Sequence, residues 1–366
     1  MLVNKAYKFR LYPNEEQTVL IAKTIGCSRF VFNRFLSQWN ETYQKTGKGL
    51  TYSACSAELT QLKKELTWLK EVDSHSLQSS LKNLADSFDR FFKKQNSAPR
   101  FKSKKNKVQS YTTNIEKKNQ LPEVSIAGNR MKLPKLGWVR FANSREVQGR
   151  ILNATVRRTP SGKYFVSLLV ETEVQELSKT HSSVGIDVGL KNFAILSNGE
   201  VFTNPKWFRT LEEKLAHAQR ILSRRKKGSS NWNKQRIKVA RIHERIAHAR
   251  KDYLDKISTH IIKNHDVIAI EDLQVVNMLK NGNLAKAISE VSWSQFRKML
   301  EYKAKWYGKQ VIAVNPYCTS QTCNVCGHTA KENRKTQSAF KCVSCGHEDN
   351  ADRNASKNIK NLAIAN

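Results

Sequence analysis

The chain opens with a segment in which apolar and basic side chains alternate. In KAYKFRLYP, tyrosine, phenylalanine and leucine alternate with lysine and arginine before a proline. A period of two is typical of a half-buried β-strand, so a strand is predicted within residues 1–13.

From residue 14 to residue 98 apolar positions recur at helical spacing, as in TVLIAKTIGCSRFVFNRFLSQW and SLQSSLKNLADSFDRFF. This segment is predicted to be a helical domain, with a plain helical bundle as the alternative interpretation.

Strand and turn patterns return in residues 99–178. The apolar runs are VSI, RMKL, GWVRF, ILNATVRR and YFVSLLVE, with AGN and TPSGK between neighbouring runs. Short strands separated by turn residues predict a small β barrel. The strand in residues 1–13 is expected to complete this barrel, so that the helical domain is an insertion between two of its strands.

A different order of elements follows in residues 179–316. Three strands are predicted in VGIDV, FAILS and EVF, then a long basic helical stretch, a strand in DVIAIE, a helix and a strand in VIAV. Three meandering strands followed by alternating helices and strands predict an RNase H-like α/β fold. Asp187 lies on the first strand and Glu271 ends the fourth. Because these strands are neighbours in such a fold, both carboxylates are expected to meet at one edge of the sheet.

Converging carboxylates suit phosphodiester hydrolysis. The reaction needs an activated water and a stabilised leaving oxygen on opposite sides of phosphorus, and two Mg²⁺ ions about 4 Å apart supply both. Magnesium prefers carboxylate and water oxygens, so two or three acids from separate elements are the expected ligands. Taken alone, GIDVG is equally consistent with an ordinary glycine-flanked strand end.

Cysteine spacing gives the strongest isolated signal. Two CxxC pairs, separated by fifteen residues, fit a four-thiolate zinc ribbon over residues 317–346. One structural Zn²⁺ with a folding role and no catalytic role is predicted. His328 and His347 are expected to be solvated or to lie next to the ligands. The predicted zinc ligands are Cys323, Cys326, Cys342 and Cys345.

The last segment, residues 347–366, is predicted to return to the nuclease-like fold as a helix. Asp349 and Asp352 are both close enough to the ribbon to supply a third carboxylate. Asp349 is placed to cap a helix that begins near residue 350. Asp352 shares a helical face with Ala355, Ser356 and Ile359 at offsets of three, four and seven. Since that face is expected to pack on the sheet, Asp352 is favoured as the third acid.

The net charge of the chain indicates what kind of molecule it binds. The chain has 64 Lys plus Arg against 31 Asp plus Glu, a net charge of +33, which favours nucleic acid over a solvated face or a membrane-binding helix. Seven of the fifteen residues from 93 to 107 are basic, with an aromatic residue among them, which favours a phosphate-tracking linker over an inert one. The basic stretch around residues 224–227 suggests a helix lining a nucleic-acid channel, or a solvated cationic helix. The candidate contacts are Lys5, Lys8, Arg10, Arg100, Lys102, Arg224, Arg225, Lys226 and Lys227.

The sequence also bears on location. The N-terminal residues contain no apolar signal core, and no window approaches the roughly 18 apolar residues needed to span a bilayer. Clustered CxxC pairs indicate metal binding and not a disulfide framework. A cytoplasmic, nucleoid-associated protein without a membrane partner is therefore expected, with a monomer favoured and the oligomeric state left open.

Several motifs, in order, resemble the TnpB (OrfB) family of bacterial and archaeal insertion sequences, which is related to type V CRISPR effectors. They include KAYKFRLYPNEEQ, RFFKKQNSAPRFK, GIDVGLKNFAILSNG, VIAIEDLQVVNM, TSQTCNVCG and DRNASKNI. The resemblance implies a wedge-like β barrel, an inserted helical recognition domain and a RuvC nuclease domain interrupted by a zinc ribbon. It implies a guide RNA from the transposon end and cleavage of double-stranded DNA beside a short flanking motif. The family's catalytic triad falls on Asp187, Glu271 and Asp352, which are all present.

Three alternatives are weighed against this hypothesis. GIDVGLKN also resembles the first phosphate loop of actin-like and Hsp70-like ATPases, but the further glycine-rich nucleotide loops of those proteins are not found. A nuclease-inactive RNA-guided or zinc-ribbon DNA-binding regulator would be favoured if a triad carboxylate were missing. A transposase acting by strand transfer is compatible with the carboxylates and is disfavoured by the family resemblance.

Overall fold

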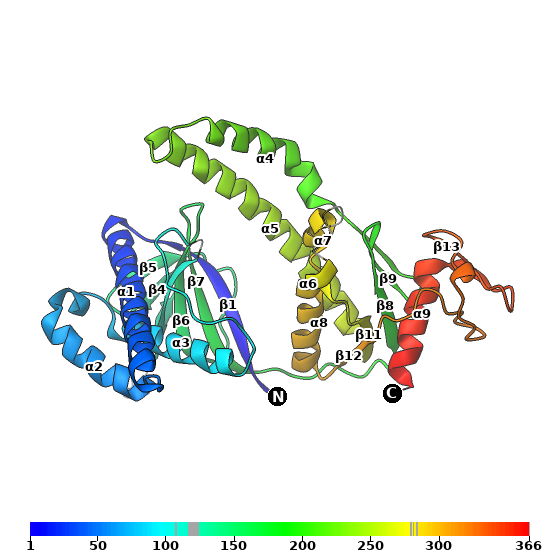
Figure 1. Cartoon of the computed structure of the whole chain (residues 1–366), viewed down its shortest axis with the longest axis horizontal. Helices are drawn as coiled ribbons and strands as arrows, with labels where there is room; N and C mark the ends of the chain where they lie inside the picture. The colour runs from blue at the N-terminus through cyan, green and yellow to red at the C-terminus, as the bar shows by residue number, and fades with distance from the viewer. Residues whose placement is uncertain (107, 116–123, 279, 281, 283–284, 366) are drawn as a thin grey trace. The chain divides into compact units, whose positions relative to one another are not determined.

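The computed structural model describes the chain except for residues 107, 116–123, 279, 281, 283–284 and 366, and except for the side chains at positions 207, 208, 210 and 276. Contacts within the chain divide it into two units, shown in Figure 1. The N-terminal unit comprises residues 2–173, and the C-terminal unit comprises Met1 and residues 174–366.

The N-terminal unit contains a seven-stranded antiparallel sheet in the order β2-β6-β7-β1-β5-β4-β3. Strand β1 lies between β7 and β5, so the predicted opening strand does join the later strands. Its alternating residues Tyr7, Phe9 and Leu11 are buried in the core of this sheet. Among the described strands β2 and β3 form the two ends, and closure into a barrel stays a prediction. The strands are β1 (Leu2–Tyr12), β2 (Gln109–Asn114), β3 (Ser125–Ala127), β4 (Arg130–Leu133), β5 (Gly137–Phe141), β6 (Arg150–Arg158) and β7 (Tyr164–Glu173).

Strand β2 is a finding that the sequence analysis does not predict. Its residues, QSYTTN, are mostly polar, and they directly follow the basic linker. In the sheet β2 pairs with β6 over its whole length. Tyr111 and Thr113 face the core with exposed fractions of 6% and 1%, so the strand does have a period of two, with threonine in one of the inward positions.

The predicted helical domain is present. It consists of α1 (Glu15–Thr46), α2 (Tyr52–Glu65), a short 3₁₀ helix (Thr67–Lys70) and α3 (Ser74–Phe92). Helix α1 begins with a capping box, in which the Asn14 side chain accepts from the Gln17 backbone and the Gln17 side chain accepts from Asn14. The Ser80 hydroxyl donates to the Ser28 carbonyl, which joins α3 to α1 through small side chains. Apolar side chains from all four helices form one core.

The C-terminal unit contains a mixed five-stranded sheet in the order β10-β9-β8-β11-β12. Strands β8, β9 and β10 are antiparallel, whereas β11 is parallel to both β8 and β12. This is the arrangement that the order of predicted elements indicated, and the fourth predicted strand does neighbour the first. The strands are β8 (Ser183–Val188), β9 (Asn192–Leu196), β10 (Val201–Thr203), β11 (Val267–Glu271) and β12 (Gln310–Val314).

Helices connect and cover this sheet (Figure 1). The long basic stretch folds into a hairpin of two helices, in which the buried Gln235 amide donates to the Ala218 carbonyl at 2.9 Å. Side chains from the second half of α5 and from α8 form a single core with the sheet. No helix among the described residues is both long enough and apolar enough to cross a membrane. The helices are α4 (Trp207–Ser223), α5 (Ser230–Asn264), α6 (Val275–Met278), α7 (Ala285–Val291) and α8 (Trp293–Tyr307).

Helix α9 (Ala351–Ile364) packs directly on β8 after the cysteine-rich segment. Gly185 permits this close approach, because a Cβ atom there would lie 2.0 Å from the Ser356 carbonyl oxygen. Ser356 and Ile359 are fully buried, so the face predicted to pack on the sheet does so. The cysteine-rich segment itself carries a short 3₁₀ helix (Lys331–Asn333) and the strand pair β13 (Ala339–Lys341) and β14 (Glu348–Asn350).

The prediction that Asp349 caps α9 is wrong. The N-cap is Asn350, whose side chain accepts from the backbone N–H groups of Asp352 and Arg353 at 3.0 and 3.2 Å. Asp349 lies one residue earlier, in β14, and forms an ion pair with Lys357 at 2.6 Å. Adjacent Asp and Asn both favour the N-cap position, and a shift of one residue is enough to exchange their roles.

Candidate metal centres

Two neighbouring parallel strands bring the first two predicted acids together. Ile186 and Ile270 are paired in the register of β8 and β11, so Asp187 and Glu271 follow at adjacent positions of the same sheet edge. Both strands are buried apolar runs up to these positions, and both carboxylates are half-buried. The expected meeting of the two acids at one edge is therefore present in the structure.

Helix α9 supplies the third acid. Asp352 lies in its first turn and, with Asp187 and Glu271, lines a cavity of about 300 Å³. The contact between Gly185 and Ser356 places the start of this helix against the strand that carries Asp187. Asp349, the competing candidate, is not among the described residues that line this cavity.

The carboxylates of Glu271 and Asp352 disfavour the ionisation of Asp187. Burial, followed by the charges of Glu271 and Asp352, raises the pKa of Asp187 well above its usual range. Burial also raises the pKa values of Glu271 and Asp352. Crowded, partly desolvated carboxylates of this kind are stabilised when a cation binds between them.

The cysteine-rich segment places two further polar groups in this cavity. The Thr319 hydroxyl donates to the Glu271 carboxylate at 2.6 Å. The Arg334 guanidinium lies 3.4 Å from the Asp352 carboxylate, and its charge lowers the pKa values of all three acids. The neighbouring Asn333 is fully buried and bonds to the backbone of both CxxC loops, which fixes the position of Arg334.

The sequence analysis identified neither Arg334 nor Thr319. Several basic residues lie between the two CxxC pairs, and no spacing rule distinguishes the one that reaches Asp352. Thr319 belongs to the TSQTCNVCG motif, so its place just before the first cysteine pair is a signal that could have directed attention to it.

The donor set fits Mg²⁺ in chemistry. Three carboxylates with room for water between them are the ligands that this ion prefers. The three acids are not packed tightly against one another. Among the described residues, the cysteine quartet is the one group of three or more Asp, Glu, His or Cys residues whose ligand atoms all lie within 4.8 Å of one another.

The four predicted cysteines do converge. The Sγ atoms of Cys323 and Cys345 are 3.7 Å apart, and those of Cys326 and Cys342 are 3.5 Å apart. A tetrahedral zinc site with metal–sulfur bonds of roughly 2.3 Å has sulfur–sulfur distances of about 3.8 Å. The quartet therefore fits one Zn²⁺. It includes neither His328 nor His347, in agreement with the expectation that neither histidine is a ligand.

Each cysteine pair lies in a loop of the same design. In the first loop, Cys323 N–H donates to the His328 carbonyl and Gly327 N–H donates to the Cys323 carbonyl. The second loop repeats both hydrogen bonds from Cys342. Gly327 and Gly346 both have φ of 74°, a conformation that glycine adopts without strain. Backbone N–H donation from Cys345 is the main cause that lowers the pKa of Cys342 to about 6, which favours the metal-binding thiolate.

Of the predicted nucleic-acid contacts in the N-terminal unit, Lys8, Arg100 and Lys102 are exposed, whereas Lys5 and Arg10 are half-buried. Lys8 and Arg10 alternate with the buried residues of β1, and both cations lie over the Phe165 ring, at 4.5 and 5.2 Å from its centroid. Lys5 lies over the Tyr7 ring on the same strand. Arg100 is exposed in the linker.

Lys102 is held against α1 by contacts of both its side chain and its backbone, unlike a lysine that is free to bind a phosphate. Its ammonium lies 3.7 Å from the centroid of the Phe32 ring, and desolvation lowers its pKa. Its backbone N–H and carbonyl both bond to the Asn33 side chain. This part of the linker is therefore fixed on α1 and is not an unattached chain.

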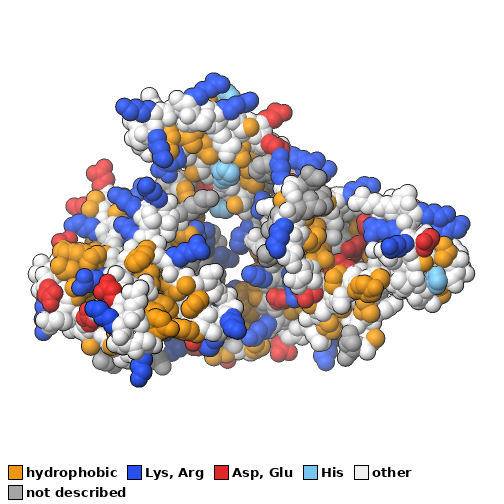
Figure 2. Space-filling model, viewed as in Figure 1, with side chains coloured by type: hydrophobic (Ala, Val, Ile, Leu, Met, Phe, Trp, Pro, Cys, Tyr) orange, Lys and Arg blue, Asp and Glu red, His pale blue; other side chains and the backbone are white. Residues whose placement is uncertain are grey.

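The remaining predicted contacts lie at the turn between α4 and α5. Residues 224–227 form this turn, which ends at Gly228 and the N-cap Ser229. Figure 2 shows Lys and Arg side chains across the visible surface of both units.

A mixed five-stranded sheet with two carboxylates at one edge, a third carboxylate on the helix that packs on it and a four-cysteine ribbon defines a RuvC-type, RNase H-like domain. Family models match the chain in three places. A model described as "Probable transposase" matches residues 167–282, and a model described as "Cas12f1-like, TNB domain" matches residues 293–359. A model described as "Helix-turn-helix domain" matches residues 1–48, where the structure has a strand followed by one long helix.

Known proteins resemble the chain over nearly its whole length. It is 40% identical over 374 residues to "Putative RNA-guided DNA endonuclease InsQ" of Escherichia coli (strain K12), covering 97% of this chain and 91% of that protein. A "Putative RNA-guided DNA endonuclease" of Streptomyces pristinaespiralis is 37% identical over 367 residues, and the match covers 99% of this chain and 90% of that protein. The chain belongs to the TnpB (OrfB) family.

A solved structure has the same fold. The protein in "Cryo-EM structure of the Cas12f1-sgRNA-target DNA complex" matches with a TM-score of 0.63 and 13% identity, covering 98% of this chain and 99% of that chain. At this identity the match describes the fold alone.

Proposed function

We propose that this protein is a transposon-encoded, RNA-guided DNA endonuclease that cleaves double-stranded DNA next to a short flanking motif. The observation that carries the proposal is the intact trio Asp187, Glu271 and Asp352, which lines one cavity in a chain whose curated relatives are named RNA-guided DNA endonucleases. A nuclease-inactive regulator would not require three intact carboxylates around one cavity. Strand transfer remains the second candidate activity, supported by the description of the transposase family model.

The three carboxylates are proposed as ligands of two Mg²⁺ ions. When bound, these ions supply an activated water and stabilise the leaving oxygen. The chain itself places the carboxylates on three elements, keeps them partly desolvated and surrounds them with Arg334 and Lys191. Both cations line the same cavity as the acids, so we propose that they help to bind the phosphates of the scissile strand.

The remaining parts of the chain are proposed to hold nucleic acid. We assign residues 1–13 and 99–178 to a wedge domain, residues 14–98 to a recognition domain, and residues 179–316 and 347–366 to the nuclease domain. Outward-facing cations over aromatic rings, as at Lys8 and Arg10, suit RNA backbones and bases. Base pairing with a guide RNA from the transposon end would then read the DNA target. A cytoplasmic, nucleoid-associated location follows from this activity.

The first test replaces the carboxylates on the two strands. Asp187→Asn and Glu271→Gln should abolish Mg²⁺-dependent cleavage of a guide-matched plasmid, because each removes a ligand charge while keeping the side-chain shape. Guide-RNA affinity, measured by filter binding, should stay within about twofold of wild type. Cleavage by either variant at the wild-type rate would refute the assignment.

The second test concerns the RNA. Protein purified from its host should carry a discrete RNA, and the affinity for that RNA should fall steeply between about 50 and 200 mM salt as counterions are released. Sequencing the copurified RNA identifies the guide. Protein that is free of RNA, and whose RNA affinity barely changes over this range, would contradict an RNA-guided function.

A further inference from the structure

We propose that Thr319 is a positioning residue for Glu271, and that Asn354 and Asn358 of helix α9 fix Thr319 in place together with the first zinc-binding loop. This inference rests on the proposed function. It gives the zinc ribbon a direct role in metal binding at the carboxylates, beyond the folding role expected from the sequence.

The first contact is between Thr319 and Glu271. Thr319 is only 4% exposed, and its hydroxyl donates to the Glu271 carboxylate at 2.6 Å. This length is typical of a hydrogen bond from a hydroxyl to an ionised acid. Glu271 is the last residue of β11, at the edge of the sheet where the acids meet. The hydroxyl selects one orientation of the carboxylate.

Asn358 holds the backbone at Thr319 and at Thr322, three residues later. Both hydrogens of its amide are used, one to the Thr319 carbonyl at 2.9 Å and one to the Thr322 carbonyl at 2.6 Å. Its exposed fraction is 7%, so water competes little for these bonds. The Thr319 backbone therefore moves with helix α9, which also carries Asp352.

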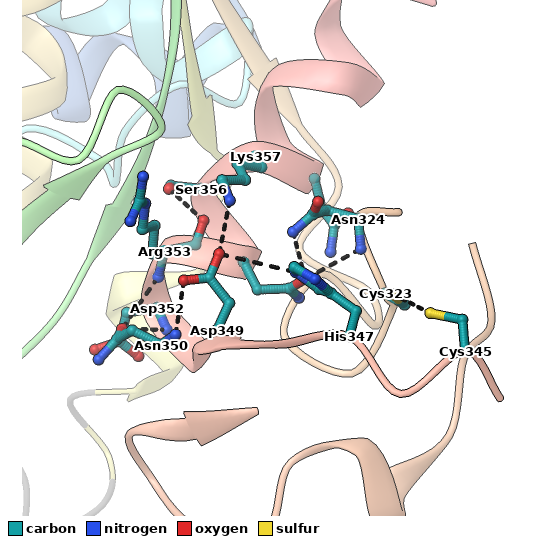
Figure 3. Close-up of polar contacts among 12 residues, drawn as sticks. Cys323, Asn324, Cys345, His347, Asp349, Asn350, Asp352, Arg353, Ser356 and Lys357 are labelled. Atoms are coloured by element: carbon teal, nitrogen blue, oxygen red, sulfur yellow. Dashed lines mark hydrogen bonds and ion pairs between the residues drawn. The ribbon is translucent and has the colours of Figure 1, made fainter. Parts of the chain in front are cut away.

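Asn354, one turn earlier, connects the same helix to the zinc-binding loop. Its amide nitrogen donates to the Thr322 carbonyl at 2.7 Å. Its oxygen accepts from the backbone and side chain of Asn324 at 3.0 and 2.7 Å, and Asn324 directly follows Cys323. Figure 3 shows Asn324 beside helix α9, close to Cys323. Asn354 is fully buried, so these bonds are shielded from solvent.

Two faces of α9 thus perform different tasks. One face carries Ser356 and Ile359 onto the sheet and Asp352 to the cavity, and the other carries the two asparagines that bind the segment from 319 to 324. A displacement of that segment would move the Thr319 hydroxyl away from Glu271. The expected consequence is weaker divalent-metal binding, because groups that orient metal ligands typically contribute about tenfold to hundredfold in affinity.

The test uses Mn²⁺ as the probe and the full, zinc-loaded chain freed of RNA, which would itself bind Mn²⁺. Binding is measured by electron paramagnetic resonance for wild type, Thr319→Val and Thr319→Ser. Valine has the shape of threonine without the hydroxyl, and serine keeps the hydroxyl. Thr319→Val should weaken Mn²⁺ binding about tenfold or more, and Thr319→Ser should restore most of the affinity.

Thr60→Val is the control. The Thr60 hydroxyl bonds to the Ser56 carbonyl within α2 of the N-terminal unit and has no part in the contacts of segment 319–324. This variant should bind Mn²⁺ as wild type does. Zinc content and melting temperature are recorded for every variant, so that a loss of Mn²⁺ affinity in a zinc-loaded, folded Thr319→Val protein cannot be due to unfolding.

Asn358→Ala tests the second half of the proposal. A folded, zinc-loaded Asn358→Ala protein should lose Mn²⁺ affinity to a similar degree as Thr319→Val, and wild-type affinity would overturn the role of the asparagine. If this variant does not fold, Thr319→Val alone decides, since it removes only a hydroxyl.

Asp187→Ala separates this inference from the proposed function. If Asp187→Ala eliminates Mn²⁺ binding and Thr319→Val leaves it unchanged, the positioning role is refuted while the nuclease site stands. If Asp187→Ala binds Mn²⁺ as wild type does, the proposed carboxylate site itself is refuted.

Discussion

The four cysteines come from two loops of the same design, whereas the three carboxylates come from a strand, another strand and a helix far apart in the chain. Each cysteine loop makes its own hydrogen bonds, so the zinc ligands are arranged largely by local backbone geometry. The carboxylates depend on strand pairing and on the close packing of α9 against Gly185. The sulfur atoms lie at distances suited to one ion, whereas the acids remain further apart, and the charges of Glu271 and Asp352 raise the pKa of Asp187.

This difference teaches how each site responds to change. A locally built site depends on its own loop and on its metal. A site assembled from distant elements depends on the packing of the whole C-terminal unit, and it carries electrostatic strain that a bound cation relieves. The four predictions below test this contrast.

The largest expected effect is that of Asp352→Ala. This variant should lose guide-directed DNA cleavage completely and keep its melting temperature, because Asp352 lines the cavity and its ion pair with the half-buried Arg334 is long, at 3.4 Å. Asp349→Ala is the matched control, since Asp349 lies three residues earlier and pairs with Lys357. It should cost about 1 kcal/mol of unfolding free energy and keep most of its activity. An active Asp352→Ala protein, or an inactive but folded Asp349→Ala protein, would reverse the assignment.

Removal of a zinc ligand comes next. Cys342→Ala should lose zinc, measured by elemental analysis, and residues 318–346 should lose protection from hydrogen exchange while β8 and β11 keep theirs. Structural zinc contributes about 10 kcal/mol or more to such small motifs. Cys55→Ala, at a buried cysteine of the other unit, is the control and should retain one zinc per chain. Freshly purified, active wild-type protein without zinc would contradict this prediction.

Gly185→Ala tests the close packing of α9 on the sheet. The added Cβ would lie 2.0 Å from a backbone carbonyl, so the helix must move away, at a cost of about 3 kcal/mol. Because Asp352 moves with the helix, cleavage should fall together with stability. Chemical denaturation and a cleavage assay measure both. Gly26→Ala, in open space within α1, is the control and should not lose stability.

The smallest expected effect is at the N-cap of α9. Asn350→Ala removes the side chain that accepts from the backbone of Asp352 and Arg353, and should cost about 1 kcal/mol with most activity retained. Asn350→Asp should restore the stability, since aspartate is an equally good N-cap. Thermal melting compares the three proteins, and an unchanged melting temperature for Asn350→Ala would argue against Asn350 as the cap.

The sequence predicted the C-terminal sheet well for a physical reason. Its strands β8, β9 and β11 are mostly buried and appear as short apolar runs, and strand order follows from the alternation with helices. The zinc ligands were predictable from spacing because both loops are local. The meeting of Asp187 with Glu271 followed from the fold, since neighbouring parallel strands share an edge.

Other features depend on contacts that no local pattern records. Strand β2 was missed because threonine occupies an inward position in a mostly polar segment. Arg334 and Thr319 reach the acids only through the folding of the ribbon. Asn350 caps α9 instead of Asp349 because the helix begins one residue later than predicted. The sequence does not fix this starting point, since both side chains are suitable caps.

The position of α9 in the chain also affects when the protein can become active during translation. Elements that leave the ribosome first can fold first, and β8 and β11 are synthesised long before α9. Until α9 is made, the cavity lacks Asp352 and the surface of β8 around Gly185 has no helix to cover it. A nascent chain, or one cut short by a premature stop before residue 351, would therefore be an incomplete nuclease with an exposed apolar surface. Such a product is a substrate for chaperones and proteases and poses little danger to the host's DNA.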